Sequence, residues 1–203
     1  MSRLSLLLLL GLTSLGFAQE TSTVPSGWFL AGSDPAHYLV AVDHSEAGAA
    51  GASASLTSRS GHTDGGGTLM QQIKADKYRG KRVRFTARIK TQGVDGSATL
   101  WLRVDGPGNV EVLDNMTAPK RYLQGDHDWE ENSLVLDVAD GAVAISYGVG
   151  LHGNGKVWLD EVKLESVDQT IPVTTTLPPI HGTGGPALAE RLLPAPANLG
   201  FDR

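Results

Sequence analysis

The sequence contains no cysteine. This absence excludes disulfide bonds, thiolate metal sites, cysteine nucleophiles and lipid attachment at a cysteine. Stability must therefore come from packing and from any ion that the protein binds.

Basic residues are outnumbered, with 17 Lys and Arg against 22 Asp and Glu and a formal net charge of −5. The phosphates of nucleic acids and of anionic membranes would be repelled unless a local basic patch overcame this balance. We therefore expect neither nucleic acid nor membrane among the partners of the mature chain.

Long apolar runs are also missing after the first residues, MSRLSLLLLLGLTSLGFAQ. Arg3, the leucine-rich stretch and the small residues up to Ala18 are typical of a secretory signal peptide, which predicts cleavage after Ala18. The stretch is too short for a comfortable membrane span of about 20 residues. We expect a secreted or periplasmic protein; the alternative is an uncleaved N-terminal anchor.

Recognisable catalytic motifs are lacking as well. The chain has no G-x-S-x-G elbow, and GHTDGGGT at 61–68 lacks the lysine and the strand-to-helix context of a phosphate-binding loop. The six histidines stand in separate turns without metal-ligand spacing. The sequence therefore predicts that the protein is not an enzyme.

What is present is a run of short segments with a period of two, punctuated by Gly, Asp and Asn, which indicates β-strands. No segment carries a sustained helical stripe, so a sandwich or barrel is favoured. The expected strands cover residues 37–43, 51–58, 67–75, 82–91, 97–105, 131–138, 141–151 and 156–165.

The alternation also assigns faces, because successive side chains of a strand point to opposite sides of a sheet. In 82–91, the row from Val83 to Ile89 is apolar, and Arg84 and Arg88 belong to the polar row. In 97–105, Trp101 falls on the polar side together with Arg103.

Residues 141–151 have one face reduced to Gly, Ala and Ser. If this strand lies near Trp101, the outer face of the sheet is a groove with an aromatic wall and an arginine rim, suited to a sugar ring or another flat ligand. The alternative is that a loop covers the small residues and Trp101 packs beneath it.

Three segments resemble the galactose-binding-like jelly rolls found among carbohydrate-binding modules: YRGKRVRFTARIKT (78–91), SATLWLRVDG (97–106) and GKVWLDEVKLE (155–165). The resemblance implies an all-β jelly-roll sandwich of two antiparallel sheets over about residues 28–167. Many such modules open with a strand similar to N-L-D-F-E, which is missing here, whereas the C-terminal NLGFDR looks like it.

The expected organisation is a signal peptide at 1–18, a short segment at 19–27, the sandwich at 28–167, a Thr/Pro/Gly-rich linker or tail at 168–197, and a last segment at 198–203. That last segment is either an edge strand of this sandwich or the beginning of a truncated second module.

Asp160 is a candidate metal ligand. The alternation predicts that it shares an inward face with Trp158, Val162 and Leu164, where a carboxylate needs hydrogen bonds or a cation. In the modules that the sequence resembles, an aspartate of the closing strand helps to bind a structural calcium ion. The alternatives are a carboxylate satisfied by backbone N–H groups or one turned to solvent.

The ligand-binding candidates are side chains that could stack on a ring or donate hydrogen bonds to it. They are Trp101, Arg103, Arg88, Arg84, Gln72, Asn115 and His152. Two or three arginines on one face would favour acidic sugars; for any single arginine, a solvated strand position is the alternative.

We expect a secreted, non-catalytic module that binds carbohydrate on this face of the sandwich. The alternative is a structural or protein-interaction domain, accessory to or truncated from a larger exported or regulatory protein. In that case the same face is covered by a protein partner or by the chain itself.

Overall fold

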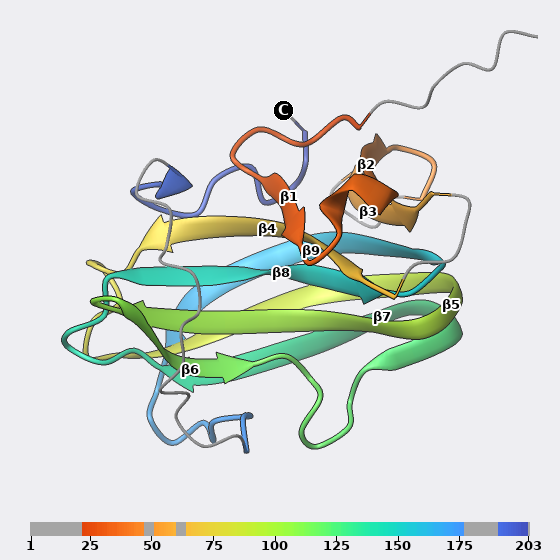
Figure 1. Ribbon diagram of the computed structural model, residues 1–203. Helices are drawn as coiled ribbons and strands as arrows, with labels where there is room; N and C mark the ends of the chain where they lie inside the picture. The colour runs from red at the N-terminus through yellow and green to blue at the C-terminus, as the bar shows by residue number, and fades with distance from the viewer. Residues whose placement is uncertain (1–21, 47–50, 60–63, 177–190, 203) are drawn as a thin grey trace, which may run out of the picture.

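The computed structural model describes residues 22–46, 51–59, 64–176 and 191–202 (Figure 1). The expected signal peptide lies outside these residues. None of the described residues belongs to a helix that could cross a membrane. The elements are β1 (Phe29–Gly32), the 3-10 helix η1 (Pro35–His37), β2 (Tyr38–Asp43), β3 (Ser53–Ser58), β4 (Gly66–Lys74), β5 (Arg82–Gly106), β6 (Asn109–Asp114), β7 (Leu123–Asp137), β8 (Ala144–His152) and β9 (Lys156–Val167).

The long strand β5 joins two antiparallel layers. Its first part, 82–92, pairs with β9 and β7 in what we call the back sheet, whose order is β2-β3-β9-β5-β7. Its second part, 97–106, pairs with β8 and β6 in the front sheet, whose order is β1-β4-β8-β5-β6. Figure 1 shows the two layers as one sheet folded over on itself. The predicted jelly-roll β-sandwich is confirmed.

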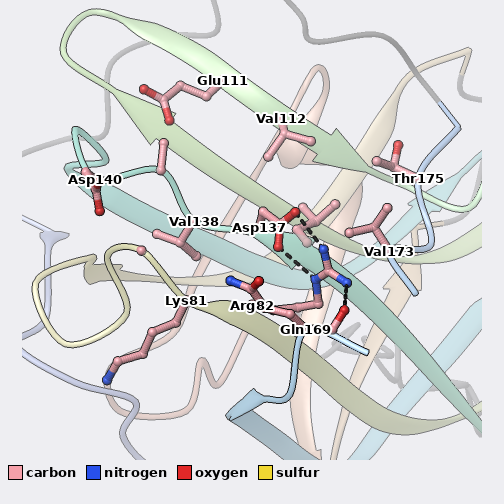
Figure 2. Close-up of a pocket in the computed structure, with 13 residues that line it drawn as sticks. Lys81, Arg82, Glu111, Val112, Asp137, Val138, Asp140, Gln169, Val173 and Thr175 are labelled. Atoms are coloured by element: carbon pink, nitrogen blue, oxygen red, sulfur yellow. Dashed lines mark hydrogen bonds and ion pairs between the residues drawn. The ribbon is translucent and has the colours of Figure 1, made fainter. Parts of the chain in front are cut away.

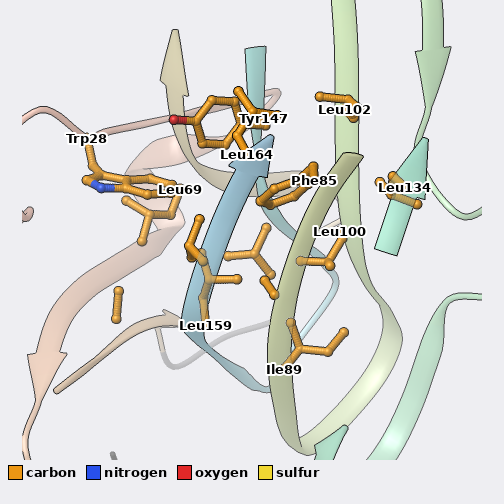
Figure 3. Packing of buried hydrophobic residues seen from close by; sticks show 14 of the residues in the cluster. Trp28, Leu69, Phe85, Ile89, Leu100, Leu102, Leu134, Tyr147, Leu159 and Leu164 are labelled. Atoms are coloured by element: carbon orange, nitrogen blue, oxygen red, sulfur yellow. The ribbon is translucent and has the colours of Figure 1, made fainter. Parts of the chain in front are cut away.

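The core lies between the layers and follows the predicted alternation. Phe85 and Ile89 from the back sheet, and Leu100 and Leu102 from the front sheet, are fully buried. Figure 3 shows these side chains pointing toward one another from the two halves of β5. Tyr147 of β8 packs against Phe85, with ring centroids 5.2 Å apart. Burying such side chains contributes about 1.5–3 kcal/mol each.

Three strand regions were not predicted, namely β1, β6 and the first half of β7. β1 has only four residues and β6 only six. The first half of β7 is polar, and from Gln124 to Ser133 it buries no side chain. Alternation reveals a strand only where one face is buried over several residues, so the first half of β7 gave no such pattern, and β1 and β6 were too short to show a sustained one.

The C-terminal residues fold back onto the sandwich. Leu193 forms a parallel bridge with Ile73 at the edge of β4. The side chain of Gln71 donates to the carbonyl of Ala197 and accepts from its N–H group. The ring of Phe201 is 1% exposed and lies 5.3 Å from that of Trp28. The described part of the last segment thus supplies a core residue.

The predicted common face of β9 is wrong. Glu161 has a positive φ of 50°, and the pairing with β5 shifts register between Thr86 and Arg88. This β-bulge changes the phase of the strand. Val162 and Leu164 consequently join the core cluster, whereas Trp158 does not.

Candidate ligand-binding groove

A groove of about 690 Å³ lies on the outer face of the front sheet, over β1, β4, β8, β5 and β6. Residues that point outward from these strands line it, because their neighbours in sequence point into the core. They are Phe29, Ala31, Gly32, Thr68, Met70, Gln72, Thr99, Trp101, Arg103, Leu113, Asn115 and Gly150.

Trp101 is half-buried in this groove and is held by its neighbours. Its Nε1 donates to Thr68 Oγ1 at 2.8 Å, and that hydroxyl donates to the Val149 carbonyl at 3.0 Å. Trp101 is paired directly with Gly148, so the predicted adjacency of the small-residue strand is confirmed. The indole Cδ1 lies 3.9 Å from where a Cβ on Gly150 would stand. Small residues on β8 therefore leave the room that this side chain occupies.

Gly148 also allows β4 and β8 to pack closely in the front sheet. A Cβ at this position would lie 2.1 Å from the Leu69 carbonyl oxygen, so the close approach of β4 requires glycine. The small-residue face of β8 thus reflects sheet packing as well as space above the sheet.

A polar network forms the floor at one end of the groove. Arg103 Nε lies 2.9 Å from Asp105 Oδ1, and Arg103 Nη2 donates to Asp105 Oδ2 at 3.1 Å. Ser146 Oγ donates to Asp105 Oδ2 at 3.2 Å and accepts from Gln72 Nε2 at 3.0 Å. Burial raises the pKa of Asp105, while the positive charge of Arg103 and the hydrogen bonds from Arg103 and Ser146 oppose that rise.

Asn115 and His152 lie at different places along the face. Asn115 lines the groove, and its Oδ1 accepts hydrogen bonds from the N–H and hydroxyl groups of Thr117. His152 lines a smaller hollow of about 200 Å³, which shares Gly32, Thr99 and Gly150 with the groove. The structure therefore brings four of the predicted ligand residues, namely Trp101, Arg103, Gln72 and Asn115, into one groove, with His152 in the adjoining hollow.

Arg84 and Arg88 do not share this face, and that prediction is wrong. Both lie in the first part of β5, which belongs to the back sheet. Arg84 pairs with Glu165 at 2.6 Å. Arg88 contacts Glu161 at 3.5 Å, and its guanidinium carbon lies 5.9 Å from the centre of the Trp129 ring. Since β5 crosses between sheets, two residues of its polar rows can lie on opposite sides of the molecule.

Asp160 is fully buried, opposite Arg88 in the register of the back sheet. Its Oδ1 accepts the N–H of Glu161 at 2.6 Å. The part of the chain that the structure describes holds no group of three or more His, Asp or Glu arranged for a metal ion. Calcium also takes backbone carbonyls as ligands, so calcium binding by Asp160 stays a prediction.

A second cavity, of about 580 Å³, lies between the edges of β6 and β7 (Figure 2). Arg82 donates to both carboxylate oxygens of Asp137 at 2.8 and 2.9 Å and to the carbonyls of Gln169 and Ile171. These hydrogen bonds hold the first residues after β9 against the start of β5. Because its guanidinium makes the ion pair and these hydrogen bonds, Arg82 has a structural role.

The groove offers a stacking surface and hydrogen-bonding groups. Arg103 is the one charged side chain among the described residues that line it, and the carboxylate of Asp105 beneath is 3% exposed. The arrangement therefore places one exposed edge of a guanidinium beside the aromatic surface.

No family model matches the sequence. Over 178 residues, or 87% of its length, the chain is 39% identical to a Bacillus subtilis protein named uncharacterized HTH-type transcriptional regulator YbfP. The match covers 56% of that protein, so the chain spans little more than half the length of this relative.

Several solved structures share the fold. Tailspike protein 4 of bacteriophage CBA120, solved as its enzymatically active domain, has a TM-score of 0.54 at 15% identity, over 70% of this chain and 20% of that one. The Stig cyclase Fisc of Fischerella sp. TAU, solved with an indole-containing compound, has a TM-score of 0.51 at 13% identity, over 76% and 92%. The CBM22-1 xylan-binding domain of Paenibacillus barcinonensis Xyn10C has a TM-score of 0.49 at 19% identity, over 73% of this chain and 89% of that one. At these identities the first two similarities concern the fold alone.

Proposed function

We propose that the chain is an exported, non-catalytic module that binds carbohydrate in the groove of the front sheet. The observation that carries the proposal is the position of Trp101, held by Thr68 beside glycines in an open groove. The C–H face of a sugar ring stacks on an indole, and its hydroxyls need hydrogen-bonding partners nearby. Arg103, Gln72 and Asn115 provide polar atoms around the same surface.

The groove also continues beyond Trp101. The hollow beside His152 adjoins it and is lined by small and polar residues such as Ser33, Ser97 and Thr99. Between Arg103 and Ser97, β5 advances six residues, or about 20 Å at the rise of an extended strand. An oligosaccharide of several linked rings would fit along this length better than a single sugar.

The test is a glycan array and a pull-down with insoluble polysaccharides, using the chain from Gln19 onward. Trp101→Ala is the test variant, and Trp158→Phe, on the opposite sheet, is the control. We expect binding that Trp101→Ala abolishes and the control retains. Binding that survives in a folded Trp101→Ala variant would contradict the proposed site.

Calcium is tested on the same samples. If Asp160 ligates a structural calcium ion, calorimetry detects calcium binding, and chelation with EDTA lowers the melting temperature of the wild type but not of Asp160→Asn. No calcium binding and no EDTA-sensitive melting would reject that prediction.

A second candidate function is an interaction or sensing domain of a larger regulatory protein. The similarity to an HTH-type regulator favours it. The described residues contain no α-helix, so they do not themselves form a helix-turn-helix. A folded chain that binds no glycan on the array would favour this second function.

A further inference from the structure

The charge of Arg103 is balanced within the floor of the groove, whereas the other guanidinium near the groove, that of the exposed Arg191, lies 4.5 Å from the centre of the Phe29 ring. Arg103 contributes a positive charge, and Asp105 sits beneath it with two nitrogen–oxygen distances of 2.9 and 3.1 Å. The side chain of Arg103 is 19% exposed, so it reaches the groove, whereas Asp105 is almost fully covered.

An unpaired arginine would attract a carboxylate or sulfate and bind it with two parallel hydrogen bonds. Here Asp105 accepts a hydrogen bond from Nη2 of Arg103 and forms an ion pair with Nε on the same side of the guanidinium. An acidic ligand must displace Asp105, which leaves a buried carboxylate without its partner, or approach Arg103 with the negative charge of Asp105 directly behind it. Much of the attraction is cancelled in either case.

The position of Asp105 is itself fixed. Its Oδ2 also accepts from Ser146, and the Ser146 hydroxyl in turn accepts from Gln72. Three strands, β5, β8 and β4, therefore hold the carboxylate under Arg103, and it cannot swing away without breaking the network.

We propose that the groove selects uncharged, hydroxyl-bearing rings and discriminates against acidic ones, and that Asp105 is the residue that determines this specificity. This inference rests on the proposed function and names the ligand class of the same groove. It also replaces the sequence-based expectation of acidic sugars, which depended on Arg84 and Arg88 sharing the face.

The test compares matched neutral and acidic ligands, such as cello-oligosaccharides and their C6-oxidised, uronic acid counterparts, by array and by calorimetry. Wild type is expected to bind the neutral member about tenfold or more tightly than the acidic one. Asp105→Asn frees Arg103, so this preference should shrink or reverse. Glu111→Gln makes the same change of charge at a carboxylate lining the second cavity and should leave the preference intact.

Asp105→Asn leaves Arg103 without its partner and can unfold the chain, so Thr99→Arg provides an independent variant. Thr99 lines the groove opposite Gly150, four residues along β5 from Arg103, so this change adds a guanidinium away from the Arg103–Asp105 pair and should gain binding to the acidic member.

The remaining outcomes separate the two claims. Equal or tighter binding of acidic ligands by wild type overturns the inference and leaves the proposed function standing. A neutral preference that is unchanged in folded Asp105→Asn overturns the role of Asp105, and one that is unchanged in the folded arginine variant overturns the claim that an unpaired guanidinium admits acidic ligands. Absence of binding to either member by folded wild type overturns the proposed function and this inference with it.

Discussion

The front and back sheets each carry a tryptophan on the outer face, in different surroundings. Trp101 is paired with Gly148 and stands in an open groove. Trp158 is paired with Lys90, is only 4% exposed, and donates from Nε1 to Asp43 at 2.9 Å. Lys156 Nζ lies 4.2 Å and Lys90 Nζ 5.8 Å from the centre of its ring. The size of the side chains on neighbouring strands thus decides whether an outward tryptophan is half-buried in a groove or almost fully covered.

Truncating the two tryptophans should give opposite results. Trp158→Ala removes a buried ring and should lower the free energy of unfolding by about 3 kcal/mol, with glycan binding unchanged. Trp101→Ala should cost about 1 kcal/mol of stability and at least about 2 kcal/mol of binding. Urea unfolding and calorimetry measure both quantities. If Trp158→Ala weakens glycan binding as much as Trp101→Ala does, the proposed difference between the two sheets is wrong.

The glycines beside Trp101 offer a second test. Gly148→Ala places a methyl group against the Leu69 carbonyl, so β4 must shift, and we expect a loss of about 2 kcal/mol in stability. At Gly150 the nearest atom is Thr99 Oγ1 at 3.2 Å, and Gly150→Ala should cost about 1 kcal/mol or less. Thermal melts of the two variants measure the difference. Equal melting temperatures would show that β4 does not approach Gly148 so closely.

The two faces should also respond differently to acid. Burial favours a higher pKa for Asp43, but hydrogen bonds from Trp158, Ser45 and the backbone at 45 and 46 hold it well below its usual range. Its stabilising contribution is therefore present above the unfolded value of about 3.9 and is lost as the pH falls further. For Asp105, whose pKa is raised, the sign is reversed, and stability is lost as the pH rises through the titration.

The measurement is a series of melts between about pH 2.5 and 6, bracketing the titration of carboxylates. Asp43→Asn should flatten the loss of stability on the acid side, whereas the same change at the exposed Asp140 serves as the control. An unchanged acid dependence in Asp43→Asn would contradict the role given to its hydrogen bonds.

The smallest effects belong to the exposed ion pair of the back sheet. Arg84 and Glu165 are 38% and 49% exposed, so solvent screens the pair. Arg84→Ala should change the free energy of unfolding by less than about 0.5 kcal/mol and leave glycan binding intact. Arg103→Ala, on the front sheet, should weaken binding measurably in the same calorimetric assay. A binding defect in Arg84→Ala would place a ligand surface on the back sheet.

Sequence periodicity identified most strands and their buried rows because a half-buried strand must alternate. It assigned Trp101 to the polar side correctly for the same reason. Alternation gives the face of a strand but not its sheet, so Arg88 and Arg103 could not be separated before the crossing of β5 was known. The bulge at Glu161 was equally hidden, since a positive φ at a glutamate has no marker in the sequence.

The polar floor of the groove depends on three strands that are distant in sequence. Gln72, Ser146 and Asp105 each look like an ordinary polar or turn residue in isolation. Only the pairing of β4 with β8 and of β8 with β5 brings them together. The local sequence pattern therefore could not predict that these three residues form one hydrogen-bond network.

The most direct test of the account uses the indole N–H signals of the four tryptophans in a proton–nitrogen correlation spectrum, recorded while a neutral oligosaccharide selected on the array is added. After assignment by single Trp→Phe variants, the Trp101 signal should shift in proportion to occupancy while the Trp158 signal stays in place. A titration that moves Trp158 and leaves Trp101 unaffected would contradict the assignment of the binding site to the front sheet.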